Sequence, residues 1–191
     1  MLRLACALSA LTCALMCTPA AAQSSAGQRT AVSTETRVKA AYLFKLRNYV
    51  EPAQGSAQAP PLGGSDYVIG IVGADEVAEE LAKIAGASAA VGAPTRVRKL
   101  RAGDPLDGVS ALFVGEADWP NRALVERAQA RRILIVADDE GALQQGAVIN
   151  FLLQDERVRF EVSIESANRA GLKLDSRLLA LATTVIKARN A

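Results

Sequence analysis

The sequence predicts a single α/β domain: a mixed sheet with a parallel core and a C-terminal antiparallel hairpin, and helices on both faces. Three short apolar runs, rich in β-branched residues, have the composition of buried strands (67–72, 109–114 and 133–137). Helical patterns lie between them, and this alternation is typical of parallel strands joined by right-handed crossovers. Further along, the runs 147–153 and 157–162 lie close enough in the chain to form a hairpin.

Residues 1–22 have the features of a cleaved secretory signal peptide. Arg3 supplies the positive start, an apolar run follows, and Ala20-Ala21-Ala22 is a cleavage motif that makes Gln23 the predicted mature N-terminus. The apolar run is shorter than the ~20 residues that a membrane span needs. A lipid anchor on Cys17 is the alternative, but a large residue stands before this cysteine where lipoprotein signals usually carry a small one. We therefore expect an exported protein that is not inserted in the membrane after cleavage.

Composition argues against several classes of function. All three cysteines lie in the leader, so no disulfide is expected in the mature chain. The chain has no histidine, which excludes Ser–His and Cys–His catalysis and the usual zinc and copper sites. Basic and acidic residues nearly balance and aromatic residues are few, which argues against nucleic-acid binding. No motif places a catalytic carboxylate pair, so we expect a binding protein without a cofactor rather than an enzyme.

The domain itself is predicted to span 34–191, after a flexible arm at 23–33 that is rich in small polar residues. A helix is predicted from Thr34 to Val50, and Pro52 ends it. Apolar residues recur along it at helical spacing (Val38, Tyr42, Leu46, Tyr49 and Val50).

Two interpretations of this helix compete. Leu43 and Phe44 widen its apolar arc, and four basic residues occupy the remaining surface (Arg37, Lys39, Lys45 and Arg47). The helix is either packed between the sheet and another helix, or it offers an apolar and basic surface to a partner. The spacing favours the packed arrangement, because apolar stripes of this kind usually face a core.

An exposed loop is predicted at 53–65, and the first buried strand follows it. Gly73 turns the chain into a helix that Asp75 can cap. This turn lacks the G-x-G-x-x-G spacing of a dinucleotide site. Several acids crowd the helix N-terminus and would repel a phosphate there, so we interpret the turn as structural.

Polar and basic segments separate the later elements. The basic run 95–101 suits an edge strand whose charges discourage pairing with other sheets. Trp119 and Pro120 are predicted to begin a helix that continues to Arg131. The acids Asp138-Asp139-Glu140, at the end of the third buried strand, suit either a cation or the start of a short helix, and no ligand spacing of a known calcium loop supports the cation.

The C-terminal segment combines strand and helix signals. In the run 157–162, apolar residues alternate with charged ones, as in a strand with one buried face. Ser163 can cap a short helix that closes at Gly171, with Leu172 packing back on it. A last helix is predicted to start near Asp175, with an apolar side made of Leu178, Leu179, Leu181, Ala182, Val185 and Ile186.

Three consecutive motifs carry a family resemblance: Gly-Ala-x-Ile-x-Phe (146–151), Arg-Val-Arg-Phe-Glu (157–161) and Ala-Gly-Leu-Lys-Leu-x-Ser-x-Leu-Leu-x-Leu-Ala (170–182). In this order they resemble the YfiR family of periplasmic regulators, as does the first helical segment through Val50-Glu51-Pro52. The resemblance covers nearly all of the chain after the leader. Two departures stand out. The tryptophan that often precedes the proline of the first segment is missing, and the absence of mature cysteine excludes the redox control of some family members.

The resemblance implies a periplasmic homodimer that binds the periplasmic domain of an inner-membrane diguanylate cyclase. It would repress the enzyme and so lower cyclic di-GMP signalling and biofilm formation. Candidate partner contacts come from the matched motifs and the first helix: Tyr42, Phe44, Arg159, Glu161 and Leu172. A periplasmic small-ligand binder that serves a transporter or sensor is the alternative. Its site would lie at the C-terminal strand ends, near Gly73, Gly115 and Asp138.

Overall fold

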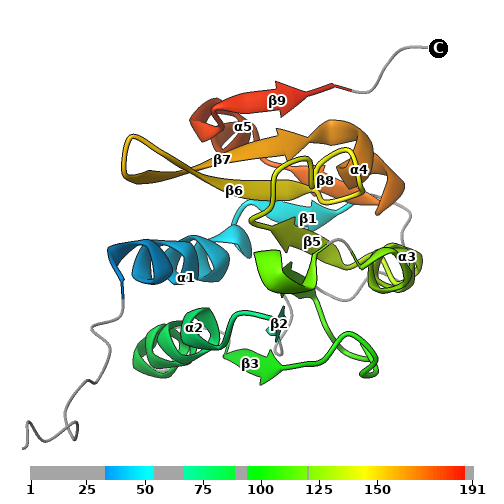
Figure 1. The fold of residues 1–191 in the computed structure, drawn as a ribbon. Helices are drawn as coiled ribbons and strands as arrows, with labels where there is room; N and C mark the ends of the chain where they lie inside the picture. The colour runs from blue at the N-terminus through cyan, green and yellow to red at the C-terminus, as the bar shows by residue number, and fades with distance from the viewer. Residues whose placement is uncertain (1–32, 54–66, 89–93, 120, 188–191) are drawn as a thin grey trace, which may run out of the picture. The chain divides into compact units, whose positions relative to one another are not determined.

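A mixed sheet forms the centre of the protein in the computed structural model, which describes residues 33–53, 67–88, 94–119 and 121–187. Its strands are β2 (Tyr67–Val72), β3 (Thr95–Lys99), β4 (Ala111–Val114), β5 (Leu134–Ala137), β6 (Ile149–Gln154), β7 (Arg157–Ser163) and β9 (Thr184–Ile186). They lie in the order β3-β2-β4-β5-β6-β7-β9 (Figure 1). The predicted leader, nearly all of the predicted arm and most of the predicted loop at 53–65 lie outside the described residues.

The strand directions confirm the predicted mixed sheet. From β3 to β6, neighbouring strands are parallel. β6 and β7 form the predicted antiparallel hairpin, in which Phe151 lies opposite Phe160. The basic run at 95–99 forms β3, which is an edge strand as the sequence predicts. The chain crosses from β3 over β2 to β4, so the strand order reverses between β2 and β4.

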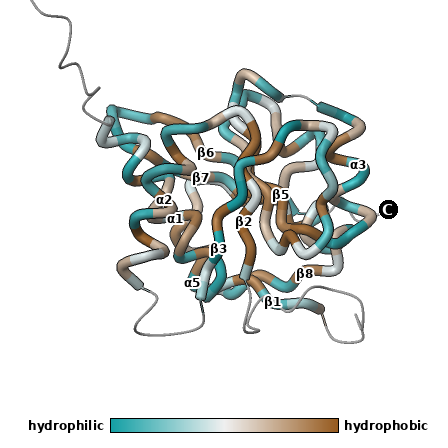
Figure 2. The backbone as a smooth tube through the Cα atoms, turned by 90° about the horizontal axis from the view of Figure 1, so that it is seen from below, coloured by the Kyte–Doolittle hydropathy of each residue, from teal (hydrophilic) through white to brown (hydrophobic). Residues whose placement is uncertain are grey.

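Helices cover both faces of the sheet, as predicted. They are α1 (Thr34–Leu46), α2 (Asp75–Ser88), α3 (Arg122–Ala130), α4 (Ile164–Arg169) and α5 (Ser176–Leu181). Figure 2 shows α1 and α2 on one side of the sheet and α3 on the other. The buried residues accordingly divide into two clusters. The larger includes residues of α1, α2 and α5, and the smaller includes residues of α3.

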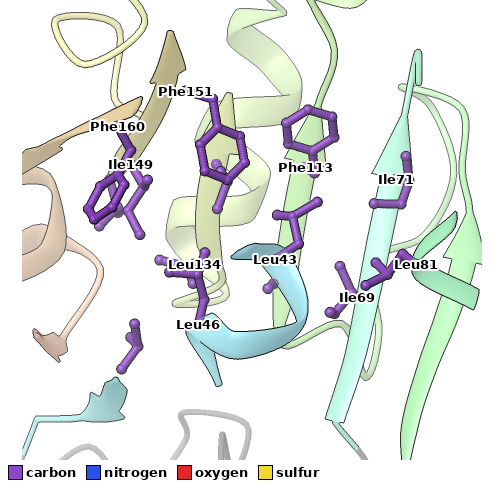
Figure 3. Packing of buried hydrophobic residues seen from close by; sticks show 14 of the residues in the cluster. Leu43, Leu46, Ile69, Ile71, Leu81, Phe113, Leu134, Ile149, Phe151 and Phe160 are labelled. Atoms are coloured by element: carbon purple, nitrogen blue, oxygen red, sulfur yellow. The ribbon is translucent and has the colours of Figure 1, made fainter. Parts of the chain in front are cut away.

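Helix α1 packs against the sheet, which confirms the first of the two interpretations of this segment. Leu43 and Leu46 point from α1 toward the large side chains of the strands, among them Phe113 and Phe151 (Figure 3). The buried stripe differs from the predicted one, because Val38 and Tyr42 are only partly buried. Helix α1 also contacts α2 along its length, and this contact leaves a groove between the two helices.

The predicted helix to Val50 is too long. Helix α1 ends at Leu46, and Val50–Pro52 forms the strand β1 instead. β1 pairs antiparallel with β8 (Leu172–Leu174) in a separate two-stranded sheet. The backbone hydrogen bonds of β1 are made with β8, which lies more than one hundred positions away in the sequence. No pattern within 34–50 could reveal that partner.

The prediction of one continuous C-terminal helix is also wrong. Asp175 does cap a helix, since its carboxylate accepts from the backbone N–H of Arg177, but α5 ends at Leu181. The Thr183 backbone N–H then donates to Phe160 O at 2.9 Å, and β9 continues parallel to β7. The apolar residues Val185 and Ile186 therefore belong to a strand.

Two shorter segments differ from their predicted form. Residues 139–146, after β5, form hydrogen-bonded turns rather than a short helix. Helix α3 starts at Arg122 with Asn121 as its cap, whereas the preceding Trp119 is buried in the smaller cluster and Pro120 is not described. The short helix α4 follows its prediction. Ser163 caps it, and Gly171 follows it with a left-handed backbone (φ +63°).

Candidate functional site

The β6–β7 hairpin is open on the side where α3 lies, whereas Ile186 of the neighbouring β9 packs at the edge of the buried cluster beneath α3. α3 contacts β5, and no residue of β6 or β7 belongs to the buried cluster beneath α3 in the described structure. Because side chains alternate along a strand, the neighbours of the buried Phe151 and Phe160 point to this open side. We call this surface the hairpin face and define it by Leu152, Arg159, Glu161, Thr184 and Ile186.

The hairpin face combines apolar and charged groups. Arg159 and Thr184 are exposed, whereas the other three residues are half-buried. Leu152 lies opposite Arg159 in the register of β6 and β7, and Glu161 lies opposite Thr184 of β9. A central carboxylate and guanidinium, with aliphatic side chains beside them, is a composition that suits protein recognition.

A two-residue turn forms the hairpin that carries this face. Asp155 and Glu156 both have positive φ values, +49° and +57°, which is the backbone of a type I′ turn. That turn matches the twist of the flanking strands. The turn also fixes the register of the hairpin. It places Gln154 opposite Arg157, and this pair determines which residues of β6 and β7 lie opposite each other further from the turn.

Glu161 is held in place by a buried asparagine. Asn150 is 3% exposed, and its Nδ2 donates to Glu161 Oε1 at 3.1 Å. Asn150 Oδ1 in turn accepts from the Asp139 backbone N–H at 3.2 Å. The second carboxylate oxygen of Glu161 has no hydrogen-bond partner within the described residues. The structure therefore orients this carboxylate and leaves one oxygen available to a partner.

Asp138, which precedes Asp139 in the chain, forms an ion pair with Lys39 of α1, on the opposite face of the sheet from the hairpin face. Its Oδ2 lies 2.9 Å from Nζ of Lys39, which also lies 2.6 Å from Glu35 Oε1. Burial by itself lowers the pKa of Lys39, but hydrogen bonds and charge from Glu35 and Asp138 outweigh it, so the pKa lies above its ordinary value. Asp138 Oδ1 is buried without a partner among the described residues. The end of β5 thus links α1 on one face to Asn150 on the other.

A cavity of about 780 Å³ lies at the C-terminal ends of β2 and β3. Its lining includes Gly73, Asp75, Lys99, Arg101 and Asp118. It is next to the point where the strand order reverses, which is where open α/β sheets commonly bind ligands. Several of its charges already have partners, since Lys99 lies within 3.3 Å of both Asp75 and Glu79.

Close packing of the backbone shapes this region. A Cβ added to Gly115 would lie 2.5 Å from Gly73 O, so only glycine fits there. Of the residues named for a ligand site in the sequence, Gly73 lines the cavity and Gly115 packs beside it. Asp138 is held by Lys39 instead. No group of three or more acidic side chains in the described part of the chain is arranged to hold a metal ion.

Comparison with known proteins assigns the chain to a family. The model of the YfiR/HmsC-like family matches residues 36–183, which is most of the chain and nearly all of the described elements. The chain belongs to the YfiR/HmsC-like family. A search of curated proteins found no significant match.

A solved structure has the same fold. The YfiR/HmsC-like chain is similar to the crystal structure of a conserved domain protein from Vibrio cholerae O1 biovar El Tor strain N16961, with a TM-score of 0.51 and 10% sequence identity. The match covers 78% of this chain and 60% of that chain. At this identity the similarity shows the fold alone.

The candidate contacts of this YfiR/HmsC-like protein lie in three places. Arg159 and Glu161 are on the hairpin face. Tyr42 and Phe44 lie on α1 and are partly buried; the Tyr42 ring is 5.7 Å from that of Phe160. Leu172 is 2% exposed in β8. The fold therefore brings Arg159 and Glu161 together and separates them from the other three.

Sequence reasoning missed the residues that position the site. Asn150 stands between the apolar Ile149 and Phe151, and a polar residue inside a buried strand is a signal that it has a specific hydrogen-bond partner. The ion pair of Lys39 with Asp138 left no such signal, because 99 positions separate the two residues.

Proposed function

We propose that this protein represses an inner-membrane diguanylate cyclase by binding its periplasmic domain. Bound protein holds the cytoplasmic enzyme inactive, and release raises cyclic di-GMP and favours biofilm formation. The family match over residues 36–183 is the observation that carries this proposal. Cleavage of the leader at 1–22, action as a homodimer and the lack of an enzymatic activity of its own are part of the same proposal. No helix in the described residues is long and apolar enough to cross a membrane.

The hairpin face is the surface that contacts the cyclase. Glu161 supports this assignment, because Asn150 already orients its carboxylate and little side-chain freedom remains to be lost on binding. Arg159 lies on the same strand and face, two residues away. A partner that presents a cation to Glu161 and an anion to Arg159 would be selected by charge as well as by shape.

Repression follows from differential binding. The cyclase has an active and an inactive state, and the hairpin face binds the periplasmic domain of the inactive state more tightly. The equilibrium shifts by the difference in affinity and by no more than that. Shifting it from about 99% active to about 99% inactive requires a difference in binding free energy of about 5.5 kcal/mol. A signal that covers the hairpin face would release the enzyme.

The test is charge reversal on the hairpin face. The membrane cyclase is captured from detergent extracts on immobilised wild-type protein and on the variant Glu161→Lys. We expect the variant to bind at least about tenfold more weakly, because a cation replaces an oriented carboxylate. Cells that carry this variant should also contain more cyclic di-GMP. The matched control is Glu76→Lys, which makes the same charge change at an exposed position of α2.

Two results would contradict the proposal. If the wild type and Glu161→Lys capture the cyclase equally well, the hairpin face is not the surface that contacts the cyclase. Failure of the wild type to capture any protein with a diguanylate cyclase domain, at high or low salt, would reject the repressor itself.

A periplasmic small-ligand binder is the second candidate function, and the cavity beside Gly73 favours it. Its volume, about 780 Å³, lies within the range of small-molecule sites, which is roughly 300–1,000 Å³. If this is the function, a solute raises the melting temperature of the protein. Replacing Ala102 on the cavity wall by Trp should abolish that rise while leaving cyclase capture unchanged.

A further inference from the structure

The three cations of α1 and Arg47, which caps its C-terminus, fall into two classes. Lys39 is held between Glu35 and Asp138, with Nζ to oxygen distances of 2.6 and 2.9 Å. Arg47 donates to Thr95 Oγ1 at 2.7 Å. Both of these cations therefore stabilise the fold.

Arg37 and Lys45 are different. Both are exposed, and neither side chain has an ion-pair or hydrogen-bond partner within the described parts of the chain. They lie eight positions apart on one side of α1, so about 12 Å of helix separates them. Among the described residues, nothing compensates these two positive charges.

Both charges line a groove between α1 and α2, on its α1 side. Its apolar floor consists of Val38, Ala41 and Tyr42 of α1 with Ile84 of α2, and its volume is about 560 Å³. All four floor residues are partly exposed. The groove is apolar along the middle and positive on the α1 side.

The α2 side of the groove adds little charge of its own. Glu80 is the one acid in its lining, and its Oε1 lies 2.5 Å from Nζ of Lys83. Because this carboxylate has a cationic partner, the positive charge of Arg37 and Lys45 dominates the groove.

We propose that this groove binds an acidic amphipathic α-helix of a partner protein. The apolar face of such a helix would cover the floor, as in other helix-in-groove complexes. Two acidic residues spaced two turns apart would reach Arg37 and Lys45. This surface is separate from the hairpin face, and the proposal does not depend on the identity of the membrane partner.

Charge also argues against a second copy of this chain as the occupant. In a two-fold symmetric contact through the groove, each α1 would face the other, since the same patch is used on both subunits. Arg37 and Lys45 would then lie near their own counterparts, and like charges across an interface are unfavourable. An acidic partner is the occupant that the unpaired cations select.

The test uses a labelled synthetic helix with leucines on one face and two glutamates placed two turns apart. Its binding to the purified protein is followed by fluorescence anisotropy, beside the same peptide with lysine at both glutamate positions. Two variants change the groove: Arg37→Glu with Lys45→Glu reverses its charge, and Ala41→Trp fills its floor. The matched control, Arg122→Glu with Arg131→Glu, makes the same charge change on and just after α3, on the opposite face of the sheet.

We expect the acidic peptide to bind saturably and the lysine peptide to bind at least about tenfold more weakly. The charge-reversed variant should lose about the same factor, and Ala41→Trp should also weaken binding, while the α3 control stays within about twofold. Circular dichroism confirms that each variant is folded.

Three outcomes would overturn the proposal. The acidic peptide shows no saturable binding, or it binds the charge-reversed variant as well as the wild type. Alternatively, the protein alone forms a dimer that the same charge reversal disrupts, which would make a second copy the occupant of the groove. Each of these results leaves the proposed role of the hairpin face untouched.

Discussion

The two halves of the sheet differ in what covers them. Strands β2 and β4 are buried at every position, because α1 and α2 pack on one face and α3 on the other. In β7, by contrast, exposed and buried residues alternate over its first four positions. In the covered half, the side chains on both faces of the strands pack in a core. The open half needs only one apolar face, so its other face can carry residues such as Arg159 and Glu161 at little cost to stability.

The largest expected difference between the two halves is the loss of stability when a substitution creates a cavity in the covered half. Phe113 in β4 is fully buried, and Phe113→Ala should lower the free energy of unfolding by about 3–5 kcal/mol. Leu152→Ala, on the hairpin face, should cost about 1 kcal/mol. Urea denaturation measures both. Equal losses would mean that the hairpin face is covered in solution.

A smaller effect is expected where the two halves meet, at Asn150. The change Asn150→Ala leaves the Asp139 backbone N–H and Glu161 Oε1 without their partner, and we expect a loss of about 1–3 kcal/mol. The exposed Gln154 is the control, and Gln154→Ala should change stability by less than about 0.5 kcal/mol. A loss confined to cyclase binding, with stability unchanged, would show that Asn150 does not support the fold.

The ion pair at the end of β5 gives a pH-dependent prediction. Lys39→Met leaves Asp138 unpaired and should cost on the order of 1–2 kcal/mol near neutral pH. The raised pKa of Lys39 means that the folded state holds this proton more tightly than the unfolded state. Its contribution is therefore complete below the ordinary lysine pKa and is lost as the pH rises through the folded one.

The stability difference between wild type and Lys39→Met should accordingly shrink in alkaline solution. Burial also raises the pKa of Tyr67, so both proteins share a second alkaline loss, and the difference between them isolates Lys39. Chemical denaturation at neutral and alkaline pH measures it. A difference that grows with pH would contradict the assigned direction of the shift.

The smallest expected effect is a gain in stability from a substitution in the open half. Asp155 and Glu156 hold left-handed backbone conformations that Asn and Gly adopt more readily. The double change to Asn-Gly should raise the free energy of unfolding by about 0.5–1 kcal/mol without altering cyclase capture. Thermal denaturation checks the first part. Weaker capture would place the turn in the binding surface.

The sequence was most informative where a pattern extends over many residues. The buried strands β2, β4 and β5 were predictable from continuous apolar runs, and the hairpin from the alternation around Phe160. The motifs at 146–151, 157–161 and 170–182 also indicated the family that the comparison confirms. Of the candidate site, Arg159 and Glu161 were chosen because they lie in a motif that carries the family resemblance, and the period of β7 places them on one face.

Short elements were not predictable in the same way. β1, β8 and β9 are three residues long. A run of that length satisfies a helical pattern as easily as an extended one, and Val50 and Val185 were both assigned to helices for this reason. Asn150 was missed, and Asp138 was assigned to a ligand site rather than to its pair with Lys39, because the roles of both depend on partners in other elements.

The amino-acid sequence by itself determined the parallel core and the hairpin, because apolar periodicity selects which face of each element is buried regardless of its neighbours. The family followed from the resemblance of three consecutive motifs. The tertiary structure alone decided that Val50–Pro52 and Thr184–Ile186 are strands, since distant strands supply their hydrogen bonds. It also decided that Lys39 has a second partner. Glu35 lies one turn away within α1, but only the packing of α1 against the sheet brings Asp138 to Lys39.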